Sequence, residues 1–325
     1  MRELGLAFNR RFEQWMFLII PAVLVLGFVL HRPLVRLVDA VPYLFAFVTL
    51  TMALDCGLKQ LRQVVARPLP MLWTLVLAHI VLPLAAYGLG AAIFGADSPY
   101  VVGFVLFTII PLGVSSVIWV GLSGGSVPLM LALVVLDSAL SPLVVPAGIH
   151  LLFGTGVEVD TSRIMSDLVL IVVAPTALGV LLHQASRGRI AGAVKPVAAP
   201  ISKLCFASVV ALNAAAIAPY VEELRSDMLR LVPVVLVLVG LCYAVGMAGV
   251  WRSRSRELTV TISYAAGMRN ISLGIVLALG YFSPLTAVPV VLGILIQQPA
   301  ATLHHYILRK LNISRSGKMT SGQVR

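Results

Sequence analysis

Charged residues are scarce in this chain, and two motifs that mark membrane-bound enzymes are missing. Asp, Glu, Lys and Arg make up 11% of the 325 residues, whereas a soluble domain carries about 25%. The sequence contains neither a His-Glu-x-x-His motif nor an Asp-Asp-x-x-Asp motif. It therefore lacks the clustered metal ligands that intramembrane hydrolases and prenyl-transfer enzymes use. We expect a membrane protein that is not an enzyme and that needs no cofactor.

Cysteine is nearly absent as well. The three cysteines, Cys56, Cys205 and Cys242, are scattered over different apolar stretches. Their spacing fits neither a disulfide framework nor a metal site. We expect each of them to be a small buried hydrophobic residue.

Apolar residues, in contrast, are abundant: 59% of the chain is hydrophobic, and the mean hydropathy is +1.00. A helix of about 20 residues crosses a hydrocarbon core about 30 Å thick. Since no small-residue cleavage site follows the first apolar run, we expect that run to be retained. Ten spans are predicted, at about 14–31, 38–58, 68–94, 98–122, 127–153, 164–184, 198–220, 229–250, 257–281 and 284–308.

The basic residues alternate between the two sides of the membrane only if the spans number ten. One set of helix ends carries clusters such as Arg10 with Arg11 and Arg252 with Arg254, whereas the opposite ends hold most of the acidic residues. Because Lys and Arg concentrate in cytoplasmic loops, we expect a multi-pass protein of the plasma (inner) membrane with both termini in the cytoplasm. Basic loops that face an anionic leaflet also explain the net charge of +11 without nucleic-acid binding.

The ten spans divide into two sets of five. Repeat one would cover about 14–153 and repeat two about 164–308. Five is odd, so the second set would enter the membrane from the opposite side, as in secondary transporters with inverted repeats. Spans five and ten support this division, because Asp137 and Gln298 stand at the same offset from a Val-Pro pair.

Spans four and nine, which correspond in the two repeats, are both interrupted. The interruptions are Pro111–Ser116 and Gly267–Ser272. Each break begins a new half-helix, and the N-terminus of a helix carries partial positive charge. Paired breaks therefore predict a site for an anion near the middle of the membrane.

Three ionisable side chains lie inside predicted spans: His79 in span three, Asp137 in span five and Arg269 in span nine. An arginine at the bilayer centre costs about 2.5–3.5 kcal/mol, so we hypothesise that Asp137 is its partner. This pair is either a static interhelical brace or a site at which Arg269 contacts an anion. His79 is either a helix-packing hydrogen bonder or, like Asp137, a group that binds and releases a proton.

The pattern resembles the bile acid:sodium symporter family. The resemblance covers roughly residues 14–308 and rests on Pro111–Ser116, Ser141-Pro142 and Gly267–Asn270. It implies an all-α polytopic membrane fold of ten transmembrane helices in two inverted five-helix repeats, with helices 4 and 9 broken and crossing near the midplane. It also implies alternating access, in which a core domain around spans three to five and eight to ten moves against a panel of spans one, two, six and seven.

The resemblance assigns roles at this crossing. The helix-break motif would consist of Pro111, Gly113, Gly267 and Met268. Substrate would lie by Ser115, Ser116, Arg269 and Asn270. The charges that replace the usual ion site would be Asp137, Arg269 and His79.

The chain departs from the family at its sodium ligands. Where the family has a glutamate and a glutamine, this sequence has Ala265 and Arg269. A carboxylate is lost and a fixed cation is gained, so we expect Arg269 to take the electrostatic role of one sodium ion. The expected function is secondary active transport of small organic anions such as carboxylates, either proton-coupled or uncoupled. A sodium-coupled symporter of bile acids or other organic anions, as in the family, is the alternative.

Two further alternatives stay open. An arsenite-type efflux permease would depend on a cysteine in span four, and none lies between Cys56 and Cys205. A membrane sensor of anions would need an output domain, whereas we expect a single transmembrane domain at 1–311 and a disordered, basic, cytoplasmic tail at 312–325. The sequence sets neither the substrate, the direction of transport nor the oligomeric state.

Overall fold

The computed structural model describes residues 2–66, 68–154, 160–220, 227–253 and 255–320. Every regular element across these ranges is helical, apart from one isolated bridge between Leu112 and Arg269. The helices are α1 (Arg2–Val29), α2 (His31–Leu34), η1 (Val35–Ala40), α3 (Val41–Ala53), α4 (Leu58–Val65), α5 (Pro68–Val76), η2 (Leu77–Val81), α6 (Leu82–Phe94), α7 (Pro99–Ile109), α8 (Ser116–Ser123), α9 (Val127–Phe153), α10 (Thr161–Leu168), η4 (Val169–Val173), α11 (Ala174–Ala185), α12 (Arg189–Ile217), η5 (Ala218–Tyr220), α13 (Met228–Gly249), η6 (Trp251–Ser253), α14 (Arg256–Gly267), α15 (Ile271–Tyr281) and α16 (Pro284–Thr320).

The helices confirm a polytopic membrane protein. Within the described ranges, seven continuous helices are long and apolar enough to cross a membrane. They are His31–Ala53, Pro68–Phe94, Val127–Phe153, Thr161–Ala185, Arg189–Ile217, Met228–Ser253 and Pro284–Leu311. The count rises to eight if Ala7–Met16 and Leu18–Val29, which are bent by 77°, form one span.

The segments predicted to be spans four and nine each contain a pair of shorter helices. The first pair is α7 and α8, which are separated by residues 110–115, and the second is α14 and α15, which are separated by 268–270. The chain leaves the helix after Ile109 because Pro111 cannot donate a backbone hydrogen bond and disfavours helical geometry in the residue before it.

Several boundaries differ from the sequence expectation. Span two is His31–Ala53 rather than about 38–58, because the amphipathic α4 begins as a separate helix at Leu58. Span seven begins at Arg189 rather than near 198, since α12 continues through two internal prolines while it packs along α1. Membrane helices tolerate such prolines where neighbours compensate for the lost hydrogen bond. In the segment expected to be disordered, α16 runs on to Thr320, and 321–325 lie outside the described residues.

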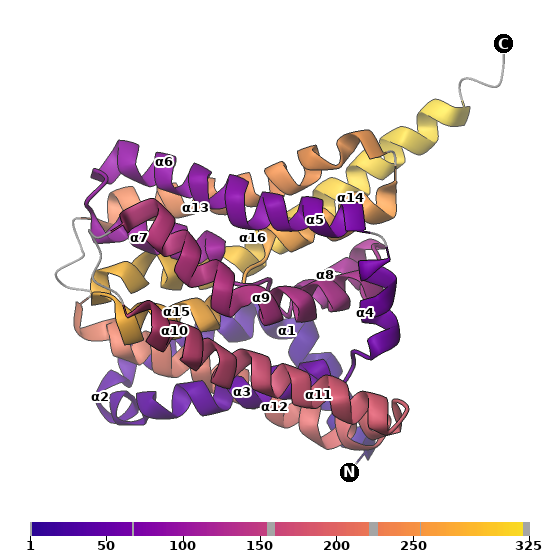
Figure 1. The fold of residues 1–325 in the computed structure, drawn as a ribbon, viewed down its shortest axis with the longest axis horizontal. Helices are drawn as coiled ribbons and strands as arrows, with labels where there is room; N and C mark the ends of the chain where they lie inside the picture. Colours follow the sequence, from indigo (N-terminus) through magenta and orange to yellow (C-terminus); the bar gives the residue numbers. More distant parts are fainter. Residues whose placement is uncertain (1, 67, 155–159, 221–226, 254, 321–325) are drawn as a thin grey trace.

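The helices pack as two groups. In one group, α12 packs against α1 and α3, and α3 packs against α11. In the other group, α7 lies against α6 and α16, and α13 lies against α14 and α16. Figure 1 shows α3, α11 and α12 on one side of the molecule and α5, α6 and α13 on the opposite side. Helix α9 contacts both broken helices, at α7, α8 and α14, so its side chains can reach the breaks.

Candidate functional site

The two helix breaks meet and are joined by their backbones. The Gly113 N–H donates to the Met268 carbonyl at 2.9 Å, and the Asn270 N–H donates to the Pro111 carbonyl at 2.8 Å. These two bonds form the antiparallel bridge between Leu112 and Arg269. Each break therefore satisfies polar backbone groups that no helix could satisfy there.

Gly113 allows this close approach. A Cβ atom at this position would lie 2.7 Å from the Arg269 carbonyl oxygen and 3.0 Å from its carbonyl carbon. Both atoms belong to the backbone of the opposite break and have little freedom to move. The glycine of the predicted break motif is thus required by the contact between the two backbones.

Each break is also held by one polar side chain from the next long helix of the chain, α9 for the first break and α16 for the second. The Leu112 N–H donates to Asp137 Oδ2 on α9 at 2.7 Å. The Arg269 N–H donates to Gln297 Oε1 on α16 at 2.8 Å, and Gln297 Nε2 donates back to the Arg269 carbonyl at 3.1 Å. The bridge residue of the first break is therefore capped by an acid and that of the second break by an amide.

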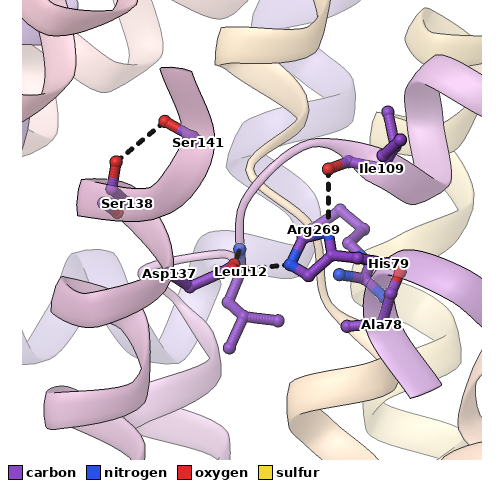
Figure 2. Close-up of polar contacts among 8 residues, drawn as sticks. All are labelled: Ala78, His79, Ile109, Leu112, Asp137, Ser138, Ser141 and Arg269. Carbon is purple, nitrogen blue, oxygen red and sulfur yellow. Dashed lines mark hydrogen bonds and ion pairs between the residues drawn. The ribbon is translucent and has the colours of Figure 1, made fainter. Parts of the chain in front are cut away.

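The second oxygen of the Asp137 carboxyl group is bound to His79. His79 Nε2 lies 2.5 Å from Asp137 Oδ1, and His79 Nδ1 lies 3.2 Å from the Ile109 carbonyl oxygen. Figure 2 shows the imidazole between these two partners, on the turn that η2 forms. Pro83 has no N–H for the His79 carbonyl four residues earlier, which explains why the helix widens to a π turn here.

The hypothesis that Asp137 is the partner of Arg269 is wrong in this structure. Among the described residues Asp137 forms its ion pair with His79, and its other oxygen is taken by a backbone N–H. The sequence analysis paired Asp137 with Arg269. In the fold, the ionisable side chain that forms an ion pair with Asp137 is His79. His79 hydrogen-bonds across helices, to Asp137 on α9 and to the Ile109 carbonyl, and its partner is the residue that had been assigned to Arg269.

Arg269 is buried behind the crossing and is only partly hydrogen-bonded. Its side chain is 1% exposed. Nη2 donates to the Ala78 carbonyl at 3.3 Å, while Nε and Nη1 are buried without a hydrogen-bond partner among the described residues. Figure 2 shows the guanidinium beside Ala78 and His79. Since a guanidinium keeps its charge in proteins, this is a fixed cation with spare donors.

A cavity of about 360 Å³ borders the crossing. Among its lining residues are Gly113, Ser115, Arg269 and Asn270 from the breaks. Two of the three guanidinium nitrogens of Arg269, Nε and Nη1, are buried and therefore not open to this cavity. The side chains from α1, α3 and α12 that line the cavity are mainly apolar and include Phe12, Met16, Ile20, Phe45, Val48 and Phe206. The same helices also contribute polar lining residues, which are Asn9, Thr51, Lys195, Ser202 and Lys203.

The structure brings most of the predicted site residues together. Ser116 does not line the cavity: its side chain is buried, and its hydroxyl donates to the Gly113 carbonyl at 2.5 Å in the first turn of α8. Pro111, Gly267 and Met268 shape the breaks and are not among the lining residues.

Two glutamines and a tryptophan at the crossing were not among the predicted site residues. Gln297 binds the backbone of Arg269, as described above. Gln298 accepts from Trp119 Nε1 at 3.1 Å, and its amide nitrogen lies 3.4 Å from Ser115 Oγ. The sequence did indicate a role for the glutamines, because two adjacent side-chain amides inside an apolar span need hydrogen-bond partners there.

Ser123 lies in a Gly-x-Ser-x-Gly spacing, at Gly121–Gly125, which is also found at the nucleophile of many hydrolases. In those enzymes the motif forms a strand-to-helix turn, whereas here Ser123 is the last residue of α8. Its hydroxyl contacts the Tyr264 hydroxyl at 3.0 Å and His305 Nδ1 at 2.8 Å. These contacts fasten the end of α8 to α14 and α16.

The residues at the crossing do not fit a sodium site of the kind that the resemblance implies. Hard cations require oxygen ligands. Ala265 offers only a buried methyl group, Arg269 brings a positive charge, and both carboxyl oxygens of Asp137 are already hydrogen-bonded. Among the described residues, no group of three or more His, Cys, Asp and Glu side chains could hold a metal ion.

Comparison with known proteins identifies the family. The model of the "Sodium Bile acid symporter family" matches residues 42–224, which is more than half of the chain. The Bacillus subtilis (strain 168) protein named "Uncharacterized protein YbaS" is 38% identical over 298 residues, which cover 91% of this chain and 97% of that protein. The "Uncharacterized sodium-dependent transporter YocS" of the same organism is 25% identical over 268 residues, 82% of this chain and 81% of that protein.

A plant relative extends this comparison. The "Probable sodium/metabolite cotransporter BASS1, chloroplastic" of Oryza sativa subsp. japonica is 30% identical over 250 residues, which cover 75% of this chain and 59% of that protein. The resemblance seen in the break motifs is thus confirmed by the family match, and the expectation of a transporter rather than an enzyme agrees with it. The chain belongs to the sodium bile acid symporter family of transmembrane transporters.

Proposed function

We propose that this protein is a secondary transporter of small organic anions that works by alternating access and does not use a two-sodium site. The observation that carries the proposal is Arg269, a buried cation at the crossing of two broken helices, where the family motif has a glutamine. A permanent positive charge repels a cation from this position and attracts an anion. The carboxylate that sodium would need is absent at Ala265.

The cavity suits a carboxylate with an apolar body. Ser115 and Asn270 lie at the starts of α8 and α15, where the partial positive charge of a helix N-terminus favours an anionic group. The facing wall of aromatic and aliphatic side chains would hold the rest of the molecule. Because Nε and Nη1 of Arg269 are buried, this residue would attract the anion mainly through its charge rather than through hydrogen bonds from these two nitrogens.

Alternating access is proposed from the packing of the two helix groups. The group of α1, α3, α11 and α12 would be the panel, and the group that carries both breaks would be the core domain. The whole would be one transmembrane domain of ten spans in two inverted repeats, about 14–153 and 164–308. In this arrangement the cavity ends near the pair of Lys195 and Asp55, whose side chains are 52% and 40% exposed. The positive-inside rule assigns that end to the cytoplasm.

Sodium coupling is the second candidate function. The printed names of two relatives, a sodium-dependent transporter and a probable sodium/metabolite cotransporter, favour it. It would require a sodium site built from backbone carbonyls and hydroxyls that differs from the family motif. An arsenite permease or an anion sensor has no specific contact in the structure that favours it.

Uptake into proteoliposomes tests the proposal. Labelled carboxylates of graded size would be offered with an inward sodium gradient, an inward proton gradient or neither, in vesicles with clamped membrane potential. We expect uptake that sodium does not stimulate. Arg269→Gln restores the family's residue and is expected to weaken anion uptake strongly, whereas Arg309→Gln, a matched change near the end of α16, leaves it intact. Sodium-stimulated uptake by the natural chain would overturn the proposal.

A further inference from the structure

We propose that His79 and Asp137 together form a proton-binding site, and that its proton fastens the first helix break. This inference rests on the proposed function, because it names the ion that would replace sodium. It starts from the hydrogen bonds around the imidazole. The Ile109 carbonyl can only accept, so His79 Nδ1 must carry a hydrogen.

The contact on the other side of the imidazole then requires a second proton. His79 Nε2 and Asp137 Oδ1 are 2.5 Å apart, which is a hydrogen-bond distance and too short for two lone pairs. Either Nε2 donates to a carboxylate or a carboxylic acid donates to Nε2. In both cases the pair holds one proton more than a neutral imidazole and a carboxylate do, and its net charge is zero.

Loss of this proton would break one of the bonds that hold the first break. If Nδ1 keeps its hydrogen, the lone pair of Nε2 faces a carboxylate and the two groups must separate. If the hydrogen moves to Nε2, the contact with the Ile109 carbonyl is lost. Since the same carboxyl group accepts from Leu112 N–H at 2.7 Å, displacement of Asp137 would also release the backbone of the bridge.

Arg269 links the proton to an anion. Its Nη2 donates to the carbonyl of Ala78, the residue before His79, so the guanidinium lies beside the pair (Figure 2). With the proton bound, the pair is neutral and the cluster keeps the positive charge of Arg269. After proton loss the charge of Asp137 cancels it. An organic anion in the adjacent cavity is therefore attracted in the protonated state, which predicts symport of one proton with one monovalent anion.

A static brace makes a different prediction. A brace would hold the two helices at any pH between 5.5 and 8.5 (roughly the range in which His titrates), and proton movement would not accompany transport. The substitution Asp137→Asn separates the two ideas. Its amide can donate to the neutral imidazole and accept from Leu112 N–H, so it reproduces the protonated pair without a proton to release.

The first test needs no substrate. Thermal unfolding of the purified full chain in detergent would be followed from pH 5.5 to 8.5 (roughly the range in which His titrates). The natural chain is expected to lose Tm as pH rises, whereas Asp137→Asn keeps the high value throughout. His79→Gln is expected to remove the same pH dependence. Asp167→Asn, the same chemical change in a carboxyl group that binds Tyr281 elsewhere, serves as the control and should follow the natural profile.

The second test measures coupling in the proteoliposomes described above. An inward proton gradient is expected to drive uptake of a monocarboxylate by the natural chain without charge movement, and Asp137→Asn is expected to lose that drive while it retains exchange of labelled for unlabelled substrate. If Tm of Asp137→Asn follows the same pH profile as the natural chain, the pair is a brace and the inference fails. If no carboxylate is transported but the Tm profiles differ as expected, the proposed function fails and the proton site stands.

Discussion

The two helix breaks are joined by matching backbone hydrogen bonds but differ in chemistry. At each break one N–H crosses to the other chain segment, and the bridge residue between them is capped by a side chain from the next long helix. The cap of Leu112 is an acid whose second oxygen depends on a histidine. The cap of Arg269 is the amide of Gln297, which supplies both an acceptor and a donor to the same residue.

This difference divides the roles of the two repeats. An amide neither gains nor loses a proton, so the hold on the second break is the same at any pH. The carboxyl group of Asp137, which shares a proton with His79, can have that proton bound or released. On this proposal the hydrogen bond that holds the first break therefore depends on pH. On the proposed proton site, the first break has a hydrogen bond that depends on a proton and the second has one that does not, and the second also positions the fixed cation Arg269.

The contact that both breaks share is expected to be the most sensitive to substitution. In Gly113→Ala the new methyl group would lie 2.7 Å from the Arg269 carbonyl oxygen, and the backbone of the second break cannot yield without loss of its own bonds. Overpacking of this kind costs about 1–3 kcal/mol. We expect a clear fall in Tm in detergent and loss of uptake.

Gly280→Ala is the matched control, because a Cβ atom at that helical position meets nothing within 4 Å. Its Tm and its uptake are expected to equal those of the natural chain. Equal Tm values for Gly113→Ala and Gly280→Ala would mean that the two breaks are not in contact as described.

The hydrogen bonds from Gln297 to the backbone of Arg269 can be made to depend on pH by one substitution. In Gln297→Glu the carboxylate can still accept from the Arg269 N–H but cannot donate to the Arg269 carbonyl while ionised. Leaving one buried acceptor unpaired costs about 1–3 kcal/mol. We expect Tm to be lower than in the natural chain at alkaline pH, where the introduced glutamate is ionised. The difference should shrink as pH falls toward the usual pKa of Glu, about 4.3, because the protonated acid regains a donor.

The control for this exchange is Gln297→Ala, which removes both bonds. It is expected to lower Tm by a similar or larger amount at every pH. If the difference in Tm between Gln297→Glu and the natural chain does not change with pH, the side chain does not cap Arg269.

The sequence predicted the breaks better than it predicted their contacts. Pro111 and Gly267 interrupt apolar runs at corresponding places, and such local signals do not depend on the rest of the fold. The partner of Asp137 depends instead on the rotation of span three, which changes at the π turn around His79. Pro83 predicts that the helix is distorted near this point. It does not predict which side chain the π turn directs toward α9.

The alignment of the two repeats shows a second limit. By offset from the Val-Pro pairs, Asp137 corresponds to Gln298, whereas the residue that caps the bridge in the same way is Gln297. One position along a helix turns a side chain by about 100°, so an error of one residue selects a different neighbour. The sequence alone could not reveal this one-residue error, because positions 297 and 298 both hold glutamine.

A smaller effect is expected where the first break meets α16. Trp119→Phe removes the donor to Gln298 Oε1 and leaves the aromatic packing on Tyr264 largely in place. A net hydrogen bond contributes about 0.5–1.5 kcal/mol. We expect a modest fall in Tm and a weaker apparent affinity for substrate, since Gln298 also contacts Ser115. An unchanged affinity would remove Gln298 from the group of residues that position Ser115.

The smallest effect is expected far from both breaks, at the pair of Lys195 and Asp55. Their side chains are 52% and 40% exposed and lie 2.9 Å apart, and exposed ion pairs contribute about 0–1 kcal/mol. Lys195→Ala is therefore expected to leave Tm within error of the natural chain at low and high salt. Because both residues border the cavity, the same variant reports on substrate approach: if the uptake rate falls while Tm is unchanged, the cation attracts the anion at the end of the cavity. A fall in Tm as large as that of Gln297→Ala would contradict the view that the stability of this site is concentrated at the two breaks.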